Sequence, residues 1–464
     1  MEIIIILLAL FFLMFVAYRG FSVILFAPIA ALFAVLLTDP GHVLPFFSGV
    51  FMDKMVGFIK NYFPVFLLGA IFGKVIEMSG FAKSITSAVI KIIGPSRAML
   101  AIVLVGAILT YGGVSLFVVA FAVYPFAAEL FKAADIPKRL IPGTIALGAF
   151  TFTMDAFPGT PQIQNIIPTT FFKTDTWAAP WLGLIGGLFV FVIGMIYLEW
   201  RRRKAKAAGE GYGTGHKNEP EQLADEKLPH PIIAILPLII VGVFNKIFTN
   251  LIPQFYGKTF DFTAINIQKV NPVDISKETA IWAVEGALVL GILTVLIFSF
   301  KRIKENFNAG INVSIGGAML ATLNTASEYG FGGIIALLPG FKAVNNAMAN
   351  TFTDPLVNEA VTTTTLAGIT GSASGGMSIA LAAMGETYLE QAQKLGINPE
   401  VLHRVASMAS GGMDTLPHNG AVITLLAVTG LTHKQSYIDI FAMTLIKTVA
   451  VFFIIALYYM FDIV

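Results

Sequence analysis

The sequence predicts an all-α integral membrane protein with about ten to twelve transmembrane helices, some of them re-entrant or broken, arranged in two inverted-topology repeats. Three observations support this fold class: an extreme hydrophobicity, recurring apolar runs of membrane-spanning length, and motifs that occur twice in the same order. Of the 464 residues, 56% are hydrophobic and only 12% are charged, with a mean hydropathy of +0.79. Soluble domains contain about 25% charged residues, so this chain requires lipid as its solvent.

Apolar runs recur along the whole chain. Crossing the hydrocarbon core takes about 20 predominantly apolar residues. The first run precedes Arg19 instead of following a basic region, so we interpret it as a transmembrane helix and not as a signal peptide. The candidate segments are 3–17, 21–38, 62–79, 97–123, 138–153, 178–200, 231–250, 279–300, 309–327, 361–384, 415–431 and 436–462.

A basic, polar segment divides the chain. Arg201 opens a basic cluster that continues to Lys206, and a glycine-containing polar stretch extends from there to Lys227. The positive-inside rule predicts that 201–227 is cytoplasmic and that the N-terminus lies outside, in a bacterial inner membrane. This topology needs an odd number of crossings before Arg201, so the short segment 138–153 is the candidate for a re-entrant or broken helix. The predicted divisions are 1–200, the linker 201–230, and 231–464.

Four motifs recur in the two halves, at offsets of 251 to 263 residues. Each pair is weak alone, but four pairs in one order are not easily accidental. Because the halves start on opposite sides of the membrane, the copies are expected to be inverted. The pairs are Glu77-Met-Ser-Gly-Phe with Glu328-Tyr-Gly-Phe, Gly112-Gly-Val-Ser with Gly375-Gly-Met-Ser, Asp135-Ile-Pro with Ile397-Asn-Pro, and Met154-Asp-Ala-Phe-Pro with Met413-Asp-Thr-Leu-Pro.

The double-glycine motifs are the first candidates for a substrate site. They interrupt apolar segments, and broken helices expose backbone N–H groups and a positive dipole end that favour an anion, while unwound carbonyl groups favour a cation. Close helix packing is an equally good explanation for each glycine alone. The candidates are Gly112, Gly113, Ser115, Gly375, Gly376 and Ser378. The first motif of each half, at Glu77 and Glu328, is expected to end the third helix of that half.

The proline-containing motifs are the second candidates. Proline and glycine within an apolar region predict non-helical tips that face one polar cavity near mid-membrane. A carboxylate at that depth is costly, which favours a functional role for Asp155 and Asp414 over a structural one. His418 either carries a proton or bonds the backbone. The accompanying candidates are Pro158, Gly159, Thr160, Thr415, Pro417 and Asn419.

The segments 154–165 (MDAFPGTPQIQN) and 411–421 (GGMDTLPHNGA), together with 17–20 (AYRG), resemble the gluconate:proton symporter family, and within it the branch of D-beta-hydroxybutyrate permeases. The resemblance implies the architecture of the ion transporter superfamily and an elevator or related motion. It implies a scaffold at about 1–80 and 231–330 that forms a homodimer, and a transport unit at about 81–175 and 332–435. Gluconate-type members carry Pro-His-Pro-Gly-Pro where this chain has Pro-Gly-Thr-Pro at 158–161, which favours a shorter acid than gluconate.

Together these features predict a secondary active transporter that imports a small organic anion, a short hydroxy acid such as 3-hydroxybutyrate or a gluconate-like acid. The coupling proton is expected on Asp155, Asp414 or His418. Sodium is the alternative, held by unassigned carbonyl and hydroxyl oxygens at the tips. No Arg or Lys lies in the repeated motifs, so backbone amides and Ser, Thr and Asn donors are expected to hold the substrate carboxylate.

Other classes lack their sequence signals. There is no His-Glu-x-x-His or Gly-x-Ser-x-Gly motif for an enzyme, and no selectivity motif for a channel. The absence of cysteine excludes disulfides and Cys-ligated metals, and the net charge of +2 gives no indication of nucleic-acid binding. We expect no cofactor other than the coupling ion, and the partners are the substrate, the lipid membrane and a second copy of the chain.

Overall fold

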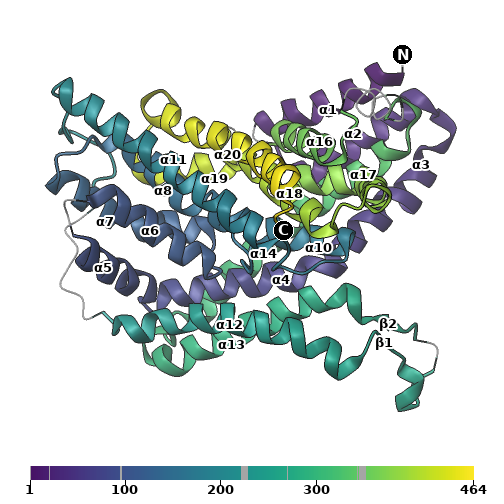
Figure 1. Cartoon of the computed structure of the whole chain (residues 1–464), viewed down its shortest axis with the longest axis horizontal. Helices are drawn as coiled ribbons and strands as arrows, with labels where there is room; N and C mark the ends of the chain where they lie inside the picture. Colours follow the sequence, from purple (N-terminus) through teal and green to yellow (C-terminus); the bar gives the residue numbers. More distant parts are fainter. Residues whose placement is uncertain are drawn as a thin grey trace.

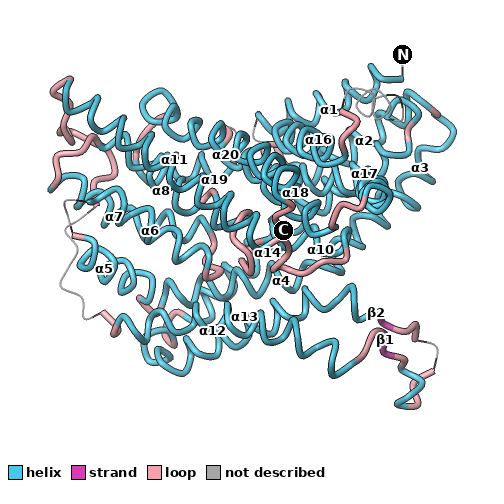
Figure 2. The backbone as a smooth tube through the Cα atoms, in the orientation of Figure 1, coloured by secondary structure: helices cyan, strands magenta, loops and turns pink. Residues whose placement is uncertain are grey.

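Helices make up nearly all of the computed structural model, which describes residues 2–19, 21–94, 97–220, 228–268, 270–341, 343, 352–417 and 419–464 (Figure 1). Within these residues the strands are confined to one antiparallel pair, β1 (Thr259–Phe260) and β2 (Val273–Asp274). This pair lies at the far end of two long helices, away from the rest of the molecule (Figure 2). The predicted all-helical class is confirmed.

The first half begins with three helical segments, continues with paired shorter helices and ends with one long helix. A π-helical turn, Phe47–Phe51, joins the short α3 to α4. The helices are α1 (Glu2–Tyr18), α2 (Val23–Thr38), α3 (Val43–Phe46), α4 (Met52–Met78), α5 (Phe81–Ile93), α6 (Ala98–Tyr111), α7 (Leu116–Ala133), α8 (Ile141–Ala149), α9 (Phe152–Asp155), α10 (Ile163–Phe172) and α11 (Pro180–Ala207).

The second half repeats this order. Three long helices are followed by a helical hairpin, a broken helix and a long final helix. The first half has the same succession, except that two of its first three helices are shorter and α5 precedes its hairpin. Its helices are α12 (Pro231–Tyr256), α13 (Ile275–Ile303), α14 (Phe307–Leu337), α16 (Pro355–Thr370), α17 (Ala373–Leu395), α18 (Pro399–Gly411), α19 (Gly420–Thr429) and α20 (His433–Phe461). The duplicated order agrees with the repeated motifs, whereas the inversion of the copies in the membrane is still a prediction.

Five stretches of the described chain are helical, long and apolar enough to cross a membrane alone: Pro40–Met78, Pro180–Ala207, Pro231–Tyr256, Ile275–Ile303 and His433–Phe461. The other predicted spans lie on shorter helices or on long helices, such as α14, that do not meet both conditions, so the total of about ten to twelve stays a prediction. The break expected in 138–153 is present, because α8 ends at Ala149 and the next two helices are short.

One predicted helix end is wrong. The third helix of the second half does not end at the Glu328 motif, because α14 continues to Leu337. In the first half, Gly80 takes a left-handed φ of +76°, and this conformation ends α4. Gly330 instead stays helical and packs against Phe51, where an added Cβ would come within 3.0 Å of the ring. The predicted boundary between scaffold and transport unit at 330–332 therefore falls inside a continuous helix.

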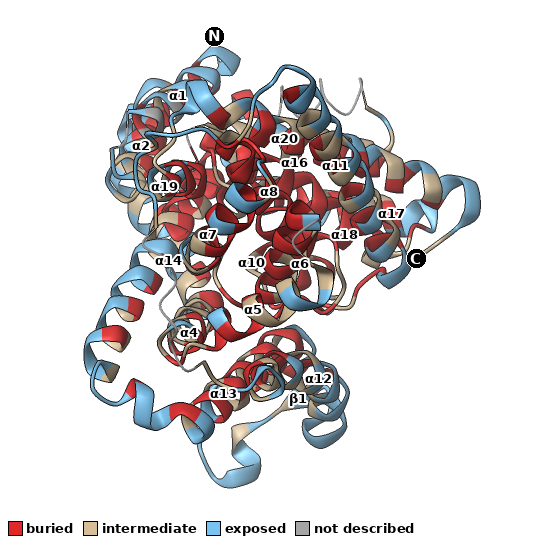
Figure 3. Cartoon of the chain, turned by 90° about the vertical axis from the view of Figure 1, so that its left-hand side faces the viewer, coloured by how far each residue is buried: buried red, intermediate tan, exposed pale blue. Residues whose placement is uncertain are grey.

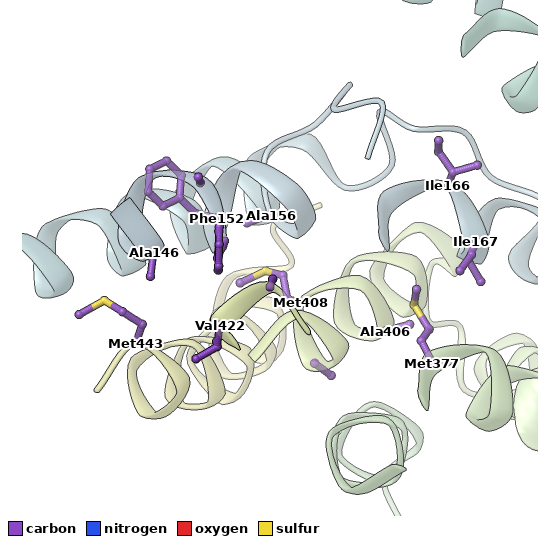
Figure 4. Packing of buried hydrophobic residues seen from close by; sticks show 14 of the residues in the cluster. Ala146, Phe152, Ala156, Ile166, Ile167, Met377, Ala406, Met408, Val422 and Met443 are labelled. Atoms are coloured by element: carbon purple, nitrogen blue, oxygen red, sulfur yellow. The ribbon is translucent and has the colours of Figure 1, made fainter. Parts of the chain in front are cut away.

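The broken helices lie in the centre of the molecule. Every residue of α8 is buried, as is every residue of 401–411 in α18. Figure 3 shows the buried residues gathered around α8, α10 and α18, with exposed residues on the outer helices α1, α12 and α13. Phe152 and Ala146 of the first half pack near Val422 and Met443 of the second (Figure 4). The two repeats therefore share one core, and their breaks are enclosed by it.

Candidate functional site

Both predicted proline tips, 155–162 and 414–420, contain a non-helical break, but the breaks are shorter than predicted. Asp155 ends α9, Asp414 lies in a 3-10 turn and Gly420 begins α19. Residues 156–162 separate α9 from α10, and residues 416–419 separate a 3-10 turn, Gly412–Thr415, from α19. Pro158, Gly159 and Thr160 lie in the first break. Thr415 closes the 3-10 turn, and Pro417 and Asn419 lie in the second break. His418 lies outside the described residues.

The first double-glycine motif forms a hairpin tip as predicted. Gly112, Gly113 and Ser115 lie between α6 and α7, and Gly113 has a φ of +95° that only glycine adopts readily. This tip packs against the long helices of both halves. Gly113 lies beside Phe72 of α4 and Leu288 of α13, with an added Cβ 3.6 Å from each side chain.

The second double-glycine motif does not interrupt a helix, so that prediction is wrong. Gly375 and Gly376 lie in the first turn of α17, and the hairpin turns earlier, at Gly371, whose φ is +69°. Ser372 caps the helix by accepting a hydrogen bond from the Gly375 N–H at 3.1 Å. A side chain at Gly376 would collide with the backbone of α16, so this glycine permits close packing of the two arms. Ser378 is buried further along α17.

An amide side chain joins each hairpin tip to the break of the same half. The Gln162 Nε2 donates to the Thr110 carbonyl at 2.8 Å, and the Asn419 Nδ2 donates to the Gly371 carbonyl at 2.9 Å. Both residues are the N-caps of the helices that follow the breaks, α10 and α19. Gln162 was missing from the predicted site, although its position directly after Pro-Gly-Thr-Pro was a usable signal. The equivalent bonds agree with a duplicated origin of the halves.

Asp414 connects the two halves at the second tip. Its Oδ1 accepts from the Ala373 N–H at 3.1 Å and from the Asn419 Nδ2 at 3.2 Å, and its Oδ2 accepts from the Gln164 Nε2 at 2.8 Å. Ala373 is the first residue of α17, so the carboxylate lies at the positive end of that helix. Three donors thus stabilise the ionised form of this buried side chain.

Asp155 forms a buried ion pair with Lys447 of α20, with 1% and 2% of the two side chains exposed. Gly411 leaves the space for this pair, because a side chain there would collide with the Asp155 carboxylate. The two aspartates lie close enough for their charges to interact. Sequence reasoning missed Lys447 because it belongs to no repeated motif, although a lysine within an otherwise apolar span was itself a signal.

A second cation, Arg404 of α18, holds the first break. Its Nη1 donates to the Asp155 carbonyl at 2.9 Å and to the Asn165 Oδ1 at 3.0 Å, and its Nη2 donates to the Ala178 carbonyl at 2.7 Å. The expectation of a site built without fixed cations is therefore incomplete. Lys447 and Arg404 both reach the break, but each is engaged with the protein itself.

The helix N-termini at the breaks differ between the halves. Side chains cap α17 and α19, whereas no described side chain caps α7, after Ser115, or α10, after Gln162. The first amides of such a helix have no partner within the helix and carry its positive dipole end. The two uncapped ends are neighbours, because Gln162 also lies 3.5 Å from the Val114 carbonyl. Together they offer donors for an anion.

Among the described residues, no group of three or more His, Asp or Glu side chains could hold a metal ion, and the sequence contains no cysteine. The polar groups that the structure places at the breaks are hydrogen-bond donors, helix N-termini and the Asp155–Lys447 ion pair.

Comparison with known proteins assigns the family. The uncharacterized transporter YxjC of Bacillus subtilis (strain 168) is 65% identical to this chain over 466 residues, which cover 99% of both chains. The chain belongs to the YxjC family of transporters. It is therefore a multi-pass membrane transporter and not an enzyme. No family model matches the sequence.

Solved structures support the fold of this YxjC-family transporter. The crystal structure of the YdaH transporter of Alcanivorax borkumensis aligns over 92% of this chain and 90% of its own, with a TM-score of 0.57 and 15% identity. The structure of MtrF from Neisseria gonorrhoeae aligns over 88% and 83%, with a TM-score of 0.49 and 11% identity, which is too weak to support an argument. The likeness to YdaH shows that the chain shares the fold of that all-helical membrane protein.

Proposed function

We propose that this YxjC-family protein is a proton-coupled secondary transporter that imports a small organic anion across the bacterial inner membrane. A short hydroxy acid such as 3-hydroxybutyrate is the preferred substrate, with a gluconate-like acid second. The observation that carries the proposal is the meeting of two uncapped helix N-termini, those of α7 and α10, at the first break.

The chemistry of these ends supports an anionic substrate. Unpaired backbone N–H groups at a helix N-terminus bind carboxylates with hydrogen bonds and with the helix dipole. The side chain of Ser115 makes no capping bond, so its hydroxyl is available to the substrate's own hydroxyl group. Lys447 contributes no free charge, because it is paired with Asp155. Binding is then weak and reversible, as transport requires.

The packing of the hairpin tips supports alternating access. The first tip lies against α4, α12 and α13, where an added side chain at Gly112 would collide with Leu238. The second tip lies against α14, where Gly332 leaves room for Ile379. Both hairpins thus meet the long helices through glycines, which give smooth surfaces for sliding. We assign the long helices to a dimeric scaffold and the hairpins with the broken helices to the moving unit.

A ligand screen by thermal shift tests the substrate class. Purified protein is heated with D-3-hydroxybutyrate, D-gluconate, short keto acids or dicarboxylic acids, at several pH values, with and without sodium. A ligand at 100 times its Kd stabilises the native state by about 2.7 kcal/mol. We expect stabilisation by D-3-hydroxybutyrate that grows as the pH falls and that does not depend on sodium.

A matched pair of variants tests whether that stabilisation arises at the uncapped N-termini of α7 and α10. Ser115→Ala should reduce the shift, and Ser372→Ala, at the capped end of the other hairpin, should reduce it less. No shift with any acid would contradict the proposal, and a shift that appears only with sodium would favour sodium coupling.

A further inference from the structure

We propose that Glu328 of α14 carries the coupling proton, at the contact between this long helix and the tip of the second hairpin. The inference rests on the proposed proton-coupled transport and identifies the group that links proton binding to movement. It replaces the three groups on which the proton was expected, Asp155, Asp414 or His418, with a carboxyl group outside the proline tips.

The Glu328 side chain is buried at the hairpin tip. The residue is 3% exposed, and its carboxyl group lies against Gly375, where any side chain would collide with it. One turn earlier on α14, the Thr325 Oγ1 lies 3.4 Å from the Ser374 Oγ of the same tip. The contact between α14 and α17 is therefore polar at its centre, unlike the apolar contact of the first tip with Phe72 and Leu288.

No described residue forms an ion pair with the Glu328 carboxyl group. Its buried Oε2 also has no hydrogen-bond partner among the described residues. By contrast, Asp155 is paired with Lys447, and Asp414 accepts three hydrogen bonds. An unpaired buried carboxylate costs several kcal/mol, so Glu328 holds a proton in this conformation, whereas the two aspartates are stabilised as anions.

The helices packed around Glu328 bring few titratable groups. Neither α2 nor residues 373–385 of α17 contain a charged residue or a tyrosine. Lys54, at the start of α4, lays the stem of its side chain against Gly333, but the residue itself is exposed. The neighbouring Tyr329 packs its ring on Phe58 of α4, next to Tyr62. Among the described residues, the protonation state of Glu328 therefore depends on its burial against the hairpin and not on a fixed counter-charge.

The location gives a direct coupling mechanism. While the hairpin tip covers Glu328, the carboxyl group must stay neutral. When the hairpin slides away from α14, water reaches the carboxyl group and the ionised form becomes accessible. Movement of the hairpin onto Glu328 therefore takes up one proton from the solution that wets this group in the open position. Net proton transport then requires that this proton leave to the opposite solution, after the substrate has been released there, before the hairpin moves back.

A second buried glutamate helps to define the assignment. Glu359 of α16 is fully buried, and both of its carboxyl oxygens lack a partner among the described residues. It lies within the hairpin, where the neighbouring Asn358 accepts a hydrogen bond from the Tyr388 hydroxyl across the two arms at 2.9 Å. The surroundings of Glu359 belong to the hairpin and stay the same when the hairpin moves. The surroundings of Glu328 are formed by the hairpin together with a long scaffold helix, so they change when the hairpin moves.

The first experiment needs no substrate. Infrared spectra of the full-length protein in lipid at neutral pH report protonated carboxyl groups through their C=O stretching band. Glu328→Gln should remove one component of this band. Glu77→Gln should leave it unchanged, because this repeat-related glutamate is exposed and lies 3.0 Å from the Lys74 Nζ. An unchanged band in Glu328→Gln would overturn the inference, whatever is found for transport.

The second experiment measures proton movement. Proteoliposomes with a trapped pH-sensitive dye are given D-3-hydroxybutyrate, and proton entry is compared with uptake of the labelled acid. Glu328→Gln should lose proton entry and accumulation but keep exchange of labelled for unlabelled acid, and Glu328→Asp should regain part of both. Two aspartate variants should keep the wild-type ratio of protons to acid in the uptake that remains: Asp414→Asn, and Asp155→Asn combined with Lys447→Met so that no buried lysine is left unpaired.

Three outcomes would count against the inference. The first is proton entry at the wild-type ratio in Glu328→Gln. The second is a loss of proton entry in Glu359→Gln while Glu328→Gln behaves like wild type. The third is the same loss in an aspartate variant while Glu328→Gln behaves like wild type. Wild-type uptake without any proton entry would instead remove the proposed proton coupling itself, and the infrared result would still decide whether Glu328 is protonated.

Discussion

Replacing Lys447 by methionine is expected to destabilise the protein strongly. Methionine has a similar length and suits an apolar helix, so the change removes mainly the positive charge. That charge neutralises Asp155, and neither side chain is more than 2% exposed. Solvent therefore does not screen the pair, and the remaining carboxylate has no other cation at its oxygens among the described residues.

The magnitude follows from the burial. Removing one partner of a buried ion pair costs about 3–5 kcal/mol, against a total stability of about 5–15 kcal/mol for a typical domain. Replacing both partners by neutral groups is often close to neutral. Asp155→Asn combined with Lys447→Met should therefore recover most of the loss, because the asparagine keeps the shape without the charge.

Equilibrium unfolding in mixed SDS micelles measures these differences for the single and double variants in one thermodynamic cycle. Lys434→Met is the matched control, since it removes an exposed lysine from the same helix and should change stability by no more than about 0.5 kcal/mol. If Lys447→Met behaved like this control, or if Asp155→Asn gave no rescue, the buried pair would not be a feature of the native protein.

Three further changes have defined outcomes. Asn419→Ala removes the amide that bonds both the second tip and the nearby aspartate, and it should cost about 1–3 kcal/mol in the same unfolding assay. Gly375→Ala forces a methyl group into the Glu328 carboxyl, and it should destabilise by about 1–3 kcal/mol and slow uptake, with less effect when combined with Glu328→Ala. In the linker, hydrogen bonds from Arg139 lower the pKa of Glu210, so this pair stabilises the folded state above the ordinary glutamate pKa and loses that effect as the pH falls through the lowered value. Glu210→Gln should thus cost less than about 1 kcal/mol at neutral pH, since the pair is partly exposed, and the stability gap to wild type should close in acid.

The fold and the two breaks were predictable because their causes are local. Apolar runs report burial in lipid, and a proline close to a glycine, as at Pro158 and Pro417, predicts a break in an apolar segment. Single prolines such as Pro64 and Pro125 instead stay inside helices. Glycine is less informative, because the sequence does not show whether a glycine allows a left-handed turn or allows two helices to pack closely. Gly113 adopts a left-handed turn, whereas Gly376 lies within a helix and lets another backbone approach.

The charged partners of the site could not be derived from the motifs. Lys447 meets Asp155 across 292 residues, and Arg404 reaches the same break from α18. Such contacts depend on how the two repeats pack and not on the local pattern. Glu328 illustrates the same limit: its motif resembled a helix end, but the continuous α14 buries it at a hairpin tip.

Simultaneous measurement of acid uptake and proton entry tests the central claim most directly. Proteoliposomes containing the wild-type protein receive labelled D-3-hydroxybutyrate under an imposed pH gradient, acidic outside, with no sodium present. We predict accumulation above the external concentration, accompanied by protons at a fixed ratio and abolished when an ionophore collapses the gradient. Accumulation that ignores the pH gradient and follows an imposed sodium gradient would contradict the account.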